Sequence, residues 1–589
     1  MADLRRWHDP GMKPKSAMTS TAASLRPTLM GSHHAVATGH YLATLAAMRV
    51  LDAGGNAVDA GVTAAMALAV VQPDIVSFAG VAPTLVYLEK EGRVVSLAGL
   101  GYWPAATDLA RLVAAGDGKS VPEGLLRTVM PAAPATHIEA LRRYGTISFE
   151  QAATPAMELA RDGFAVYSFL ANSIADHAAD YRRWPESAGL FLSAGRPPRT
   201  GERFVQAELA RSIAGMIEAE RAARGDRDRG LRAAHDYFYR GPVARAVAAY
   251  HAEHGGFMTA ADLAGFEVPV EPSIAVRWRG EEVHSCDVWC QGVTLLETLK
   301  ILEDTDFARL GHNTPQYIHR VAQALELAFG DREAWVGDPK FVQVPTAVLL
   351  SDAYAASQRA RIDPRRAFGA MPETGLPGNR AVRALPPAAR GATAMAPDTI
   401  YAAVMDRHGN AYSATLSDTS YDSPVIPGIG MVISSRGQQS RLAAGHPAQV
   451  APGKRPRLTP SPGMALRDGK PFLCFGTPGG DVQAPAMLQV FLNATQFGMQ
   501  LQQAVEAPRF SSANFPNSFP PHEYFPGRLL VEQNMAEGVI DALRALGYDL
   551  EVLPRLPAKS GAVCAVMRAP EGLKHAAADP RRECYALAW

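Results

Sequence analysis

The stretch Asp398–Asn410, which reads DTIYAAVMDRHGN, decides how the rest of the chain is interpreted. Residues 400–405 are nearly all apolar, residues 407–410 have the composition of a turn, and residues 411–417 resume with small, β-branched and aromatic side chains. This pattern predicts a β-hairpin whose first strand is covered on both faces. Thr399 opens that first strand.

Thr399 could act as a nucleophile if the chain were cut directly before it. A hydroxyl attacks poorly without a neighbouring base, and the cut would create such a base, the free α-amine of the same threonine. Because a free α-amine has a pKa of about 7.7–8.0, much of it is unprotonated near neutral pH. The alternative is that Thr399 is an ordinary β-former at the start of a strand. The motifs in the rest of the chain favour the nucleophile.

Five motifs, in this order along the chain, support a nucleophilic Thr399. They are Gly54–Ala60 (GGNAVDA), Asp331–Pro339 (DREAWVGDP), the strand that Thr399 opens, Lys454–Pro456 (KRP) and Gly476–Gly480 (GTPGG). Through these motifs the chain resembles the gamma-glutamyltranspeptidase family of N-terminal-nucleophile hydrolases, from about Ala35 to Arg555. The resemblance implies an α/β fold, a four-layer αββα sandwich.

The resemblance also implies a proenzyme that cuts itself between Asp398 and Thr399. The large subunit would comprise residues 31–398 after a flexible leader of residues 1–30, with a linker over about residues 367–398 before the cut. The small subunit would comprise residues 399–589. The two subunits of one precursor would remain associated, and further dimerisation of that unit stays open.

The family's catalytic roles fall on four residues of this sequence. Thr399 matches the nucleophile, and Ser417 matches a hydroxyl that hydrogen-bonds the nucleophile and assists self-cleavage. Gly479 and Gly480 match the glycine pair whose backbone amides stabilise the oxyanion, a task that suits glycine because its backbone can approach the reacting atom closely. The alternative for Pro478–Gly480 is an ordinary turn after a strand.

The substrate contacts of the family are altered in this chain. The family's carboxylate-binding arginine is matched by the segment Leu100–Tyr102, and the acidic residue that holds the substrate ammonium is matched by Gln439. Thr459 occupies the position of a family serine that contacts the substrate carboxylate, and Thr419 occupies the position of a family asparagine. A glutamine cannot pair with an ammonium as a carboxylate does. The loss of both charge partners predicts an acyl group other than gamma-glutamyl.

Arg436 enters the same segment and brings a new charge. Because guanidinium binds carboxylate bidentately, Arg436 favours a substrate with one carboxylate and no α-amine. The alternative is that Arg436 caps a turn at the surface. Tyr102, Trp103 and Tyr421 could form an aromatic wall for the substrate, or could simply pack.

These observations favour an amidohydrolase that forms an acyl-enzyme on Thr399 with a small amide or acylated amine, without a cofactor or a metal. Hydrolysis and transfer of the acyl group to an amine both stay open. A true gamma-glutamyltranspeptidase or glutathione hydrolase is the first alternative, and a non-catalytic relative that keeps the fold is the second. The retention of the four catalytic positions disfavours that second alternative.

Composition excludes several classes of protein. The 589 residues carry 58 basic and 58 acidic side chains, and no segment combines Lys and Arg with aromatics, so nucleic acid is not an expected partner. The longest apolar window, near residues 64–71, is too short to span a membrane. The five cysteines suggest no disulfide framework, and the C-x3-C spacing of Cys286 and Cys290 beside His284 lacks a second ligand pair for zinc. Residues 1–30 contain no apolar core of a signal peptide, which predicts a cytoplasmic location.

Hydrophobic periodicity gives a coarse map of the elements. Helices are expected over residues 41–71, 150–162, 202–224, 314–329, 482–497 and 533–546. Strands are expected over residues 84–88, 94–97, 430–434, 463–467 and 471–476, in addition to the hairpin.

Overall fold

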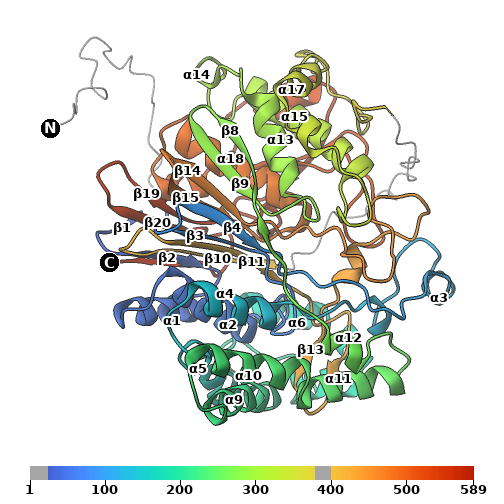
Figure 1. The fold of residues 1–589 in the computed structure, drawn as a ribbon. Coiled ribbons are helices and arrows are strands. Elements are labelled where there is room, and N and C mark those ends of the chain that lie inside the picture. The colour runs from blue at the N-terminus through green and yellow to red at the C-terminus, as the bar shows by residue number, and fades with distance from the viewer. Residues whose placement is uncertain (1–23, 378–398) are drawn as a thin grey trace.

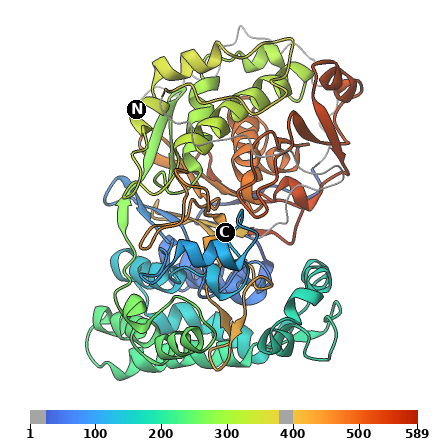
Figure 2. The ribbon, with the colours of Figure 1, turned by 90° about the vertical axis from the view of Figure 1, so that its right-hand side faces the viewer.

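The chain folds as two stacked seven-stranded sheets with a layer of helices outside each (Figures 1 and 2). The computed structural model describes residues 24–377 and 399–589. Neighbouring strands within both large sheets run antiparallel. The predicted αββα sandwich is confirmed.

Thr399 lies in the sheet with the strand order β21-β2-β10-β11-β3-β4-β7. Its strands are β21 Tyr585–Ala588, β2 Ala35–Thr38, β10 Thr399–Met405, β11 Ala411–Ser417, β3 Thr84–Leu88, β4 Arg93–Leu97 and β7 Val270–Pro272. The second sheet has the order β1-β20-β19-β15-β14-β9-β8. Its strands are β1 Leu29–Gly31, β20 Lys574–Ala578, β19 Cys564–Arg568, β15 Lys470–Gly476, β14 Gly463–Arg467, β9 Glu281–Ser285 and β8 Ile274–Trp278.

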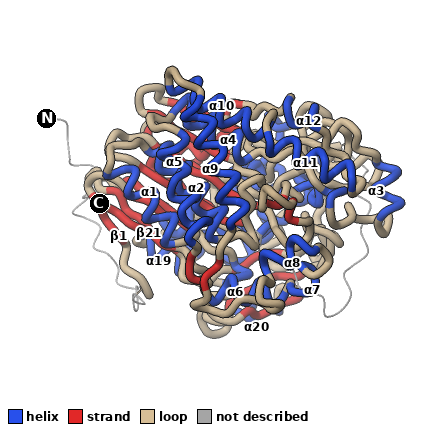
Figure 3. The backbone as a smooth tube through the Cα atoms, turned by 90° about the horizontal axis from the view of Figure 1, so that it is seen from below, coloured by secondary structure: helices blue, strands red, loops and turns tan. Residues whose placement is uncertain are grey.

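One helical layer covers the sheet of Thr399, as the view from below shows (Figure 3). It contains α1 Tyr41–Asp52, α2 Ala57–Val71, α4 Ala133–Tyr144, α5 Phe149–Asp162, α6 Ser168–Asp176, α9 Ala207–Ala222, α10 Arg227–Tyr239, α11 Pro242–Glu253 and α12 Ala260–Ala264. The other layer contains α13 Gly292–Leu302, α15 Pro315–Trp335, α17 Asp352–Arg359, α18 Gln483–Thr495 and α19 Leu501–Glu506.

Shorter elements complete the described chain. They are α3 Leu109–Ala115, α7 Ala178–Tyr181, α8 Pro185–Phe191, α14 Phe307–Leu310, α16 Thr346–Leu349, α20 Val539–Ala545, the ribbons β5 Phe164–Ala165 with β6 Arg203–Phe204 and β12 Val425–Ile426 with β13 Met431–Val432, and the small sheet of β16 Phe510–Ser512, β17 Arg528–Glu532 and β18 Asp549–Leu553.

The predicted hairpin is confirmed as β10 and β11, which pair residue by residue from Thr399 opposite Ser417 to Met405 opposite Ala411. Every residue of both strands is buried. Helix α2 lies against one face of the pair, and strands β15 and β19 of the second sheet lie against the other. The first strand is nearly all apolar from Ile400 to Met405 because both of its faces are covered.

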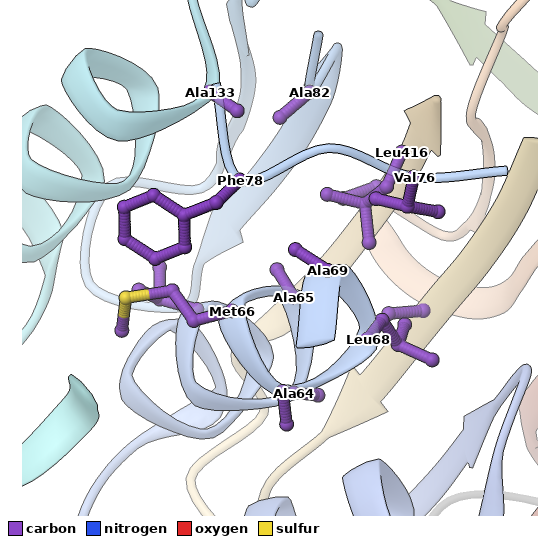
Figure 4. Close-up of a cluster of buried hydrophobic side chains, with 14 of the residues drawn as sticks. Ala64, Ala65, Met66, Leu68, Ala69, Val76, Phe78, Ala82, Ala133 and Leu416 are labelled. Atoms are coloured by element: carbon purple, nitrogen blue, oxygen red, sulfur yellow. The ribbon is translucent and has the colours of Figure 1, made fainter. Parts of the chain in front are cut away.

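Helix α2 approaches the hairpin closely because its side chains are small. All fifteen of its residues are buried, and a Cβ added to Gly61 would lie 2.2 Å from the Tyr412 ring of β11. The Asn56 side chain accepts hydrogen bonds at the start of the helix, and the Asp59 side chain completes the capping box. Ala65 and Ala69 of α2 belong to a cluster of buried hydrophobic side chains that also contains Phe78 and Leu416 (Figure 4).

Several predicted elements have different limits in the structure. The helical region expected over residues 41–71 consists of α1 and α2, and Gly54 with φ +96° turns the chain between them. The helix expected over residues 314–329 continues to Trp335, since its last charged residues are buried in ion pairs. Only residues 539–545 of the helix expected over 533–546 are helical, and Gly538 with φ +77° precedes them.

The remaining differences are small. The helix expected over residues 202–224 is α9, preceded by the two residues of β6. The strand expected over residues 430–434 is reduced to β13, and α18 ends at Thr495. The strands expected over residues 84–88 and 463–467 are confirmed as β3 and β14.

The boundaries of the predicted leader and linker need correction. Leu29 and Met30 belong to strand β1, which pairs with β20, so the last residues of the predicted leader are part of the fold. At the start of the predicted linker, the Met371 amide donates to Tyr524 Oη at 2.8 Å and the Gly375 amide donates to Tyr354 Oη at 3.1 Å. These residues are therefore anchored. The rest of the linker, residues 378–398, lies outside the described residues.

No helix in the described part of the chain has both the length and the apolarity needed to span a membrane. The five cysteines are buried free thiols. Within residues 24–377 and 399–589, no group of three or more His, Cys, Asp or Glu side chains is arranged to hold a metal ion. The cellular location stays a prediction.

Candidate active site

Thr399 and Ser417 face each other at the open end of the β10–β11 hairpin. Their hydroxyl oxygens lie 2.7 Å apart, which is hydrogen-bonding distance, and both residues are fully buried. The contact follows from the register, because directly opposite residues of an antiparallel pair present their side chains on the same face of the sheet. The structure thus brings together the two hydroxyl groups that the sequence singles out.

Arg436 lies on the other side of Ser417. Its Nη2 atom donates a hydrogen bond to Ser417 Oγ at 2.5 Å, and its guanidinium carbon lies 5.5 Å from the centre of the Phe519 ring. Arg436 opens the short 3-10 helix Arg436–Gln439 and is fully buried. The alternative of a surface turn cap is therefore wrong. The three side chains form a continuous hydrogen-bonded row from the guanidinium to the threonine hydroxyl.

Asp418 holds Arg436 in this position, and sequence reasoning missed it. One carboxylate oxygen accepts from Ser434 Oγ at 2.7 Å, and the other accepts from the Ser435 amide at 2.9 Å and lies 3.5 Å from Arg436 Nε. Burial raises the pKa of Asp418 to about 6, although Arg436 opposes the shift. An acidic residue directly after Ser417 was the available signal. Its backbone φ of +153° is rare for a residue other than glycine.

Gly479 and Gly480 form the turn between strand β15 and helix α18. Their φ angles are +118° and +57°, which only glycine adopts without strain. A Cβ on Gly476, the last residue of β15, would lie 2.3 Å from the Tyr401 ring on β10. The turn therefore begins directly after a strand end that packs against Tyr401, a residue two positions along β10 from Thr399. Two consecutive backbone amides at such a turn can bind an anionic oxygen.

Gln291 fixes the peptide group of Gly480. Its Nε2 atom donates to Gly480 O at 3.0 Å, and its Oε1 atom accepts from Arg332 Nη1 at 2.8 Å. Arg332 also forms an ion pair with Asp481, the residue after the glycine pair. The Ser518 amide donates to the same Asp481 carboxylate at 2.7 Å. These contacts make the Gly479–Gly480 turn rigid, and sequence reasoning did not assign them.

Glu333 is the centre of a neighbouring buried cluster. Its carboxylate contacts Arg457 at 2.5 Å, Arg332 at 2.8 Å and Arg441 at 3.7 Å. Burial alone would raise the pKa of Glu333, but Arg457 and Arg332 hold it well below its usual value. The carboxylate therefore stays ionised throughout the neutral pH range. The DREAWVGDP motif thus connects the helix α15 to the glycine turn.

The other predicted substrate contacts occupy a separate group. Gln439 Nε2 donates to Thr459 Oγ1 at 2.8 Å, and the Thr459 amide donates back to Gln439 Oε1 at 3.2 Å. Both ends of the glutamine amide are thereby bonded to one threonine. Thr419 is buried, and its hydroxyl has no hydrogen-bond partner within the described residues.

The three predicted wall aromatics do not form one wall. Trp103 is completely buried, and its Nε1 atom donates to Ser440 Oγ at 3.0 Å. Tyr102 packs against Phe266 with ring centres 5.5 Å apart, while Tyr421 stacks on His177 at 3.6 Å. Each aromatic therefore has its own packing partner. Asp398, on the far side of the predicted cut, lies outside the described residues.

The sandwich of two antiparallel sheets, with a paired hydroxyl at the start of a buried strand, defines a member of the N-terminal-nucleophile hydrolase fold class. A sequence model described as gamma-glutamyltranspeptidase matches residues 43–589, so the chain belongs to the gamma-glutamyltranspeptidase family. Members of this family are enzymes that hydrolyse amide bonds or transfer acyl groups, and this chain is such an enzyme at the family level.

Three similar proteins illustrate the range of the family. The chain is 32% identical to the Acylase ACY 1 proenzyme of Pseudomonas sp. (strain SE83), covering 92% of this chain and 91% of that protein. It is 29% identical to the glutathione hydrolase proenzyme of Escherichia coli (strain K12), covering 93% of this chain and 90% of that protein. The crystal structure of cephalosporin acylase from Bacillus halodurans is similar with a TM-score of 0.84 and 26% identity, covering 97% of this chain and 98% of that one.

Proposed function

We propose that this protein is a self-cleaving amide hydrolase that uses Thr399 as an N-terminal nucleophile and acts on an acyl group other than gamma-glutamyl. The observation that carries the proposal is the row of Arg436, Ser417 and Thr399, with a distance of 2.7 Å between the two hydroxyl oxygens. A buried threonine hydroxyl requires one hydrogen-bond partner, which Ser417 supplies, but burial does not require the arginine behind Ser417. Activation of the hydroxyl explains that arginine.

Maturation is the first reaction in the proposal. Thr399 Oγ1 attacks the carbonyl carbon of Asp398, the peptide C–N bond breaks, and the acyl group moves from nitrogen to oxygen as an ester. Water then hydrolyses the ester, which leaves the Asp398 carboxylate and the free α-amine of Thr399. The hydroxyl of Ser417, at 2.7 Å, is placed to hydrogen-bond the attacking oxygen.

Turnover uses the new amine as the base. The α-amine takes the hydroxyl proton as Thr399 Oγ1 attacks the substrate amide carbonyl, and the amides of Gly479 and Gly480 donate to the oxyanion. The proton passes to the leaving amine when the C–N bond breaks. Water, deprotonated by the same amine, then hydrolyses the acyl-enzyme and releases the acid. An amine in place of that water would give transfer.

Arg436 assists both reactions in the proposal. A guanidinium can only donate, so Ser417 Oγ is the acceptor in their bond and Ser417 can direct its own proton to Thr399. The nearby cation also disfavours protonation of the α-amine, which keeps more of the base in its active form at neutral pH. Asp418 offsets part of that positive charge.

The acyl group is proposed from the altered substrate contacts. Gln439 carries no charge and is bonded at both ends to Thr459, so it is a poor partner for the α-ammonium of a gamma-glutamyl group. Leu100–Tyr102 offers no cation for the α-carboxylate. Arg436 lies beside the nucleophile and suits one carboxylate on the acyl chain. The likeness to two proteins named acylases supports the same assignment.

Intact mass under denaturing conditions tests the nucleophile. We expect two fragments that break between Asp398 and Thr399, and a single uncut chain for Thr399→Ala. Thr415→Ala provides the matched control, because Thr415 is a buried threonine on the same hairpin and should leave the cut unchanged. An uncut parent chain, or a cut that persists in Thr399→Ala, would contradict the proposal.

A comparison of substrates tests the acyl group. The matured enzyme should hydrolyse anilides of succinic and glutaric acid with a kcat/KM at least about tenfold above that for the gamma-glutamyl anilide, a difference of about 1.4 kcal/mol. Equal or better activity on the gamma-glutamyl anilide would instead support a glutathione hydrolase, the activity named for the Escherichia coli relative.

A further inference from the structure

A polar cavity lies at the turn end of the β10–β11 hairpin, opposite the end that carries Thr399. Its volume is about 280 Å³. The lining residues are Glu89, Met405, Asp406, Arg407, His408, Gly409, Asn410, Lys470, Pro471, Arg568, Gly572 and Lys574. They come from the ends of β3, β10, β15, β19 and β20, so the cavity joins both sheets.

Four cations line this cavity and two carboxylates oppose them. Lys470 is paired with Glu89 at 2.6 Å, which accounts for one cation and one carboxylate. Only the Asp406 carboxylate opposes the charge of the other three cations, which are Arg407, Arg568 and Lys574. Among the described residues, no carboxylate lies within 4.0 Å of any of these three cations. The cavity therefore holds a net positive charge.

The Asp406 carboxylate is already saturated by neutral donors. It accepts from the Ala57 amide at 2.9 Å, the His408 amide at 2.8 Å, the Asn410 amide at 3.0 Å and Asn410 Nδ2 at 2.7 Å. These bonds shape the hairpin turn and cap the helix α2. Asp406 consequently accepts its hydrogen bonds from the backbone and from Asn410, and it acts on the cations of the cavity only through its charge.

Lys574 is the most informative of the cations, because its residue is only 8% exposed. Its Nζ atom has one long hydrogen bond, to the Ser32 carbonyl oxygen at 3.5 Å. Burial lowers the pKa of Lys574, the nearby Arg568 lowers it further, and Asp406 opposes both effects. A buried ammonium without an anionic partner is costly, and a bound anion would remove that cost.

We propose that this cavity is a binding site for a doubly charged oxyanion of the phosphate type, either inorganic phosphate or a phosphate monoester. Guanidinium groups bind two oxygens of such an anion at once, and the ammonium of Lys574 supplies a point charge from the buried side. The volume accommodates phosphate together with a small attached group. The proposal is independent of the chemistry at Thr399.

The bound anion would act on the stability of the hairpin. Strand β10 places its turn about 20 Å from Thr399, six steps of about 3.3 Å, so the ligand and the nucleophile do not touch. A ligand that binds only the folded state raises the unfolding temperature with its concentration. Occupancy of the cavity should therefore stabilise the protein and leave the catalytic groups unchanged.

Titration calorimetry and thermal unfolding of the purified full-length protein test the site. Sodium phosphate should bind one site per chain and raise the unfolding temperature, compared with sodium chloride at equal ionic strength. Lys574→Met and Arg568→Gln should each weaken binding by about tenfold or more, whereas Lys119→Met, an exposed lysine outside the cavity, should not change it.

Two results would overturn the proposal. They are the absence of phosphate binding to the parent, whether or not succinate binds instead, and equal affinity in the two cavity variants and the parent. Arg568 is exposed, so Arg568→Gln keeps the test valid if Lys574→Met does not fold. A parallel titration with glycerol phosphate distinguishes a monoester from free phosphate through its relative affinity.

Discussion

Two buried arginines border the candidate site, and they differ in the carboxylates that accompany them. Arg436 contacts Thr399 through Ser417, whereas Arg332 contacts the glycine turn through Gln291. Arg436 is accompanied by Asp418, whose pKa burial raises to about 6. Arg332 is paired with Glu333 and Asp481, and the pKa of Glu333 is held well below its usual value.

This difference separates stability from catalysis. The Glu333 carboxylate stays ionised at neutral pH, so loss of Arg332 removes one of the buried cations that offset its charge and also removes the ion-pair partner of Asp481. Asp418 can instead take up a proton when its arginine is lost, because a pKa of about 6 makes neutralisation inexpensive at neutral pH. We therefore expect the Arg332 region to be sensitive in folding and the Arg436 region to be sensitive in turnover.

The largest effect is expected from Arg332→Met. The substitution leaves Glu333 and Asp481 short of a buried cation and should destabilise the protein by about 3–5 kcal/mol. Urea unfolding in the uncut Thr399→Ala background measures this loss without interference from maturation. Arg544→Met, on an exposed arginine, is the control, and an unfolding midpoint equal in both would contradict the expectation.

Arg436→Met should have its largest effect on the reaction. We expect self-cleavage to slow and the kcat/KM of the matured fraction to fall by about a hundredfold, or about 2.7 kcal/mol. Without the cation the pKa of the α-amine rises, so the acid limb of the pH profile should move to higher pH. Stopped digests followed by mass and a pH series of kcat/KM measure these effects, with Arg211→Met as the exposed control.

A parent-like pH profile for Arg436→Met would show that the guanidinium does not act on the amine. A loss of stability as large as that of Arg332→Met would show that the two regions do not differ in the way their carboxylates suggest.

Gln291→Met should give a smaller loss confined to kcat. The variant removes the hydrogen bond to Gly480 O and leaves Thr399 untouched, so we expect about a tenfold fall in kcat with KM unchanged. Affinity for a boronate that mimics the tetrahedral intermediate should fall by a similar factor. Gln323→Met, another buried glutamine, is the control. A rise in KM alone would assign Gln291 to substrate binding.

The smallest effect is expected in the pH dependence of Asp418→Asn. A raised pKa means that the protonated form of Asp418 favours the folded state, so its contribution to stability is present below its ordinary pKa of 3.8 and is lost as pH rises through about 6. The parent should therefore lose part of its stability between about pH 4 and pH 6, and the variant should not. Urea midpoints across this range in the Thr399→Ala background measure the difference. Parallel pH dependences for the parent and the variant would show that Asp418 is not the group whose titration changes the stability.

The hairpin was accessible from sequence because it depends on local pattern, and the resemblance to the family singled out its two hydroxyl groups. A continuous apolar run, a turn and a second strand fix the register, and the register places Thr399 opposite Ser417. The ends of the helices were harder to predict from the sequence. The helix expected over residues 314–329 continues as α15 through the charged residues 331–333, because the partners of these charges come from distant segments.

The supporting residues were inaccessible for the same reason. Gln291 and Gly480 are 189 residues apart, and Arg332 and Asp481 are 149 apart, so no spacing in the sequence connects them. Arg436 shows that a residue can be singled out in the sequence while its surroundings stay unpredictable. Its position in the pocket segment was evident, yet only its complete burial against Ser417 excluded a surface role.

The sequence by itself determined the family, the sandwich fold and the candidate nucleophile. The family and the candidate nucleophile follow from the ordered motifs, the resemblance to the family implies the sandwich fold, and the continuity of apolar residues indicates the hairpin. Tertiary structure alone decided which charges surround Thr399 and the glycine turn. The reason is physical, since a buried charge is stable only beside a partner, and the folded chain supplies that partner from segments that are remote in sequence.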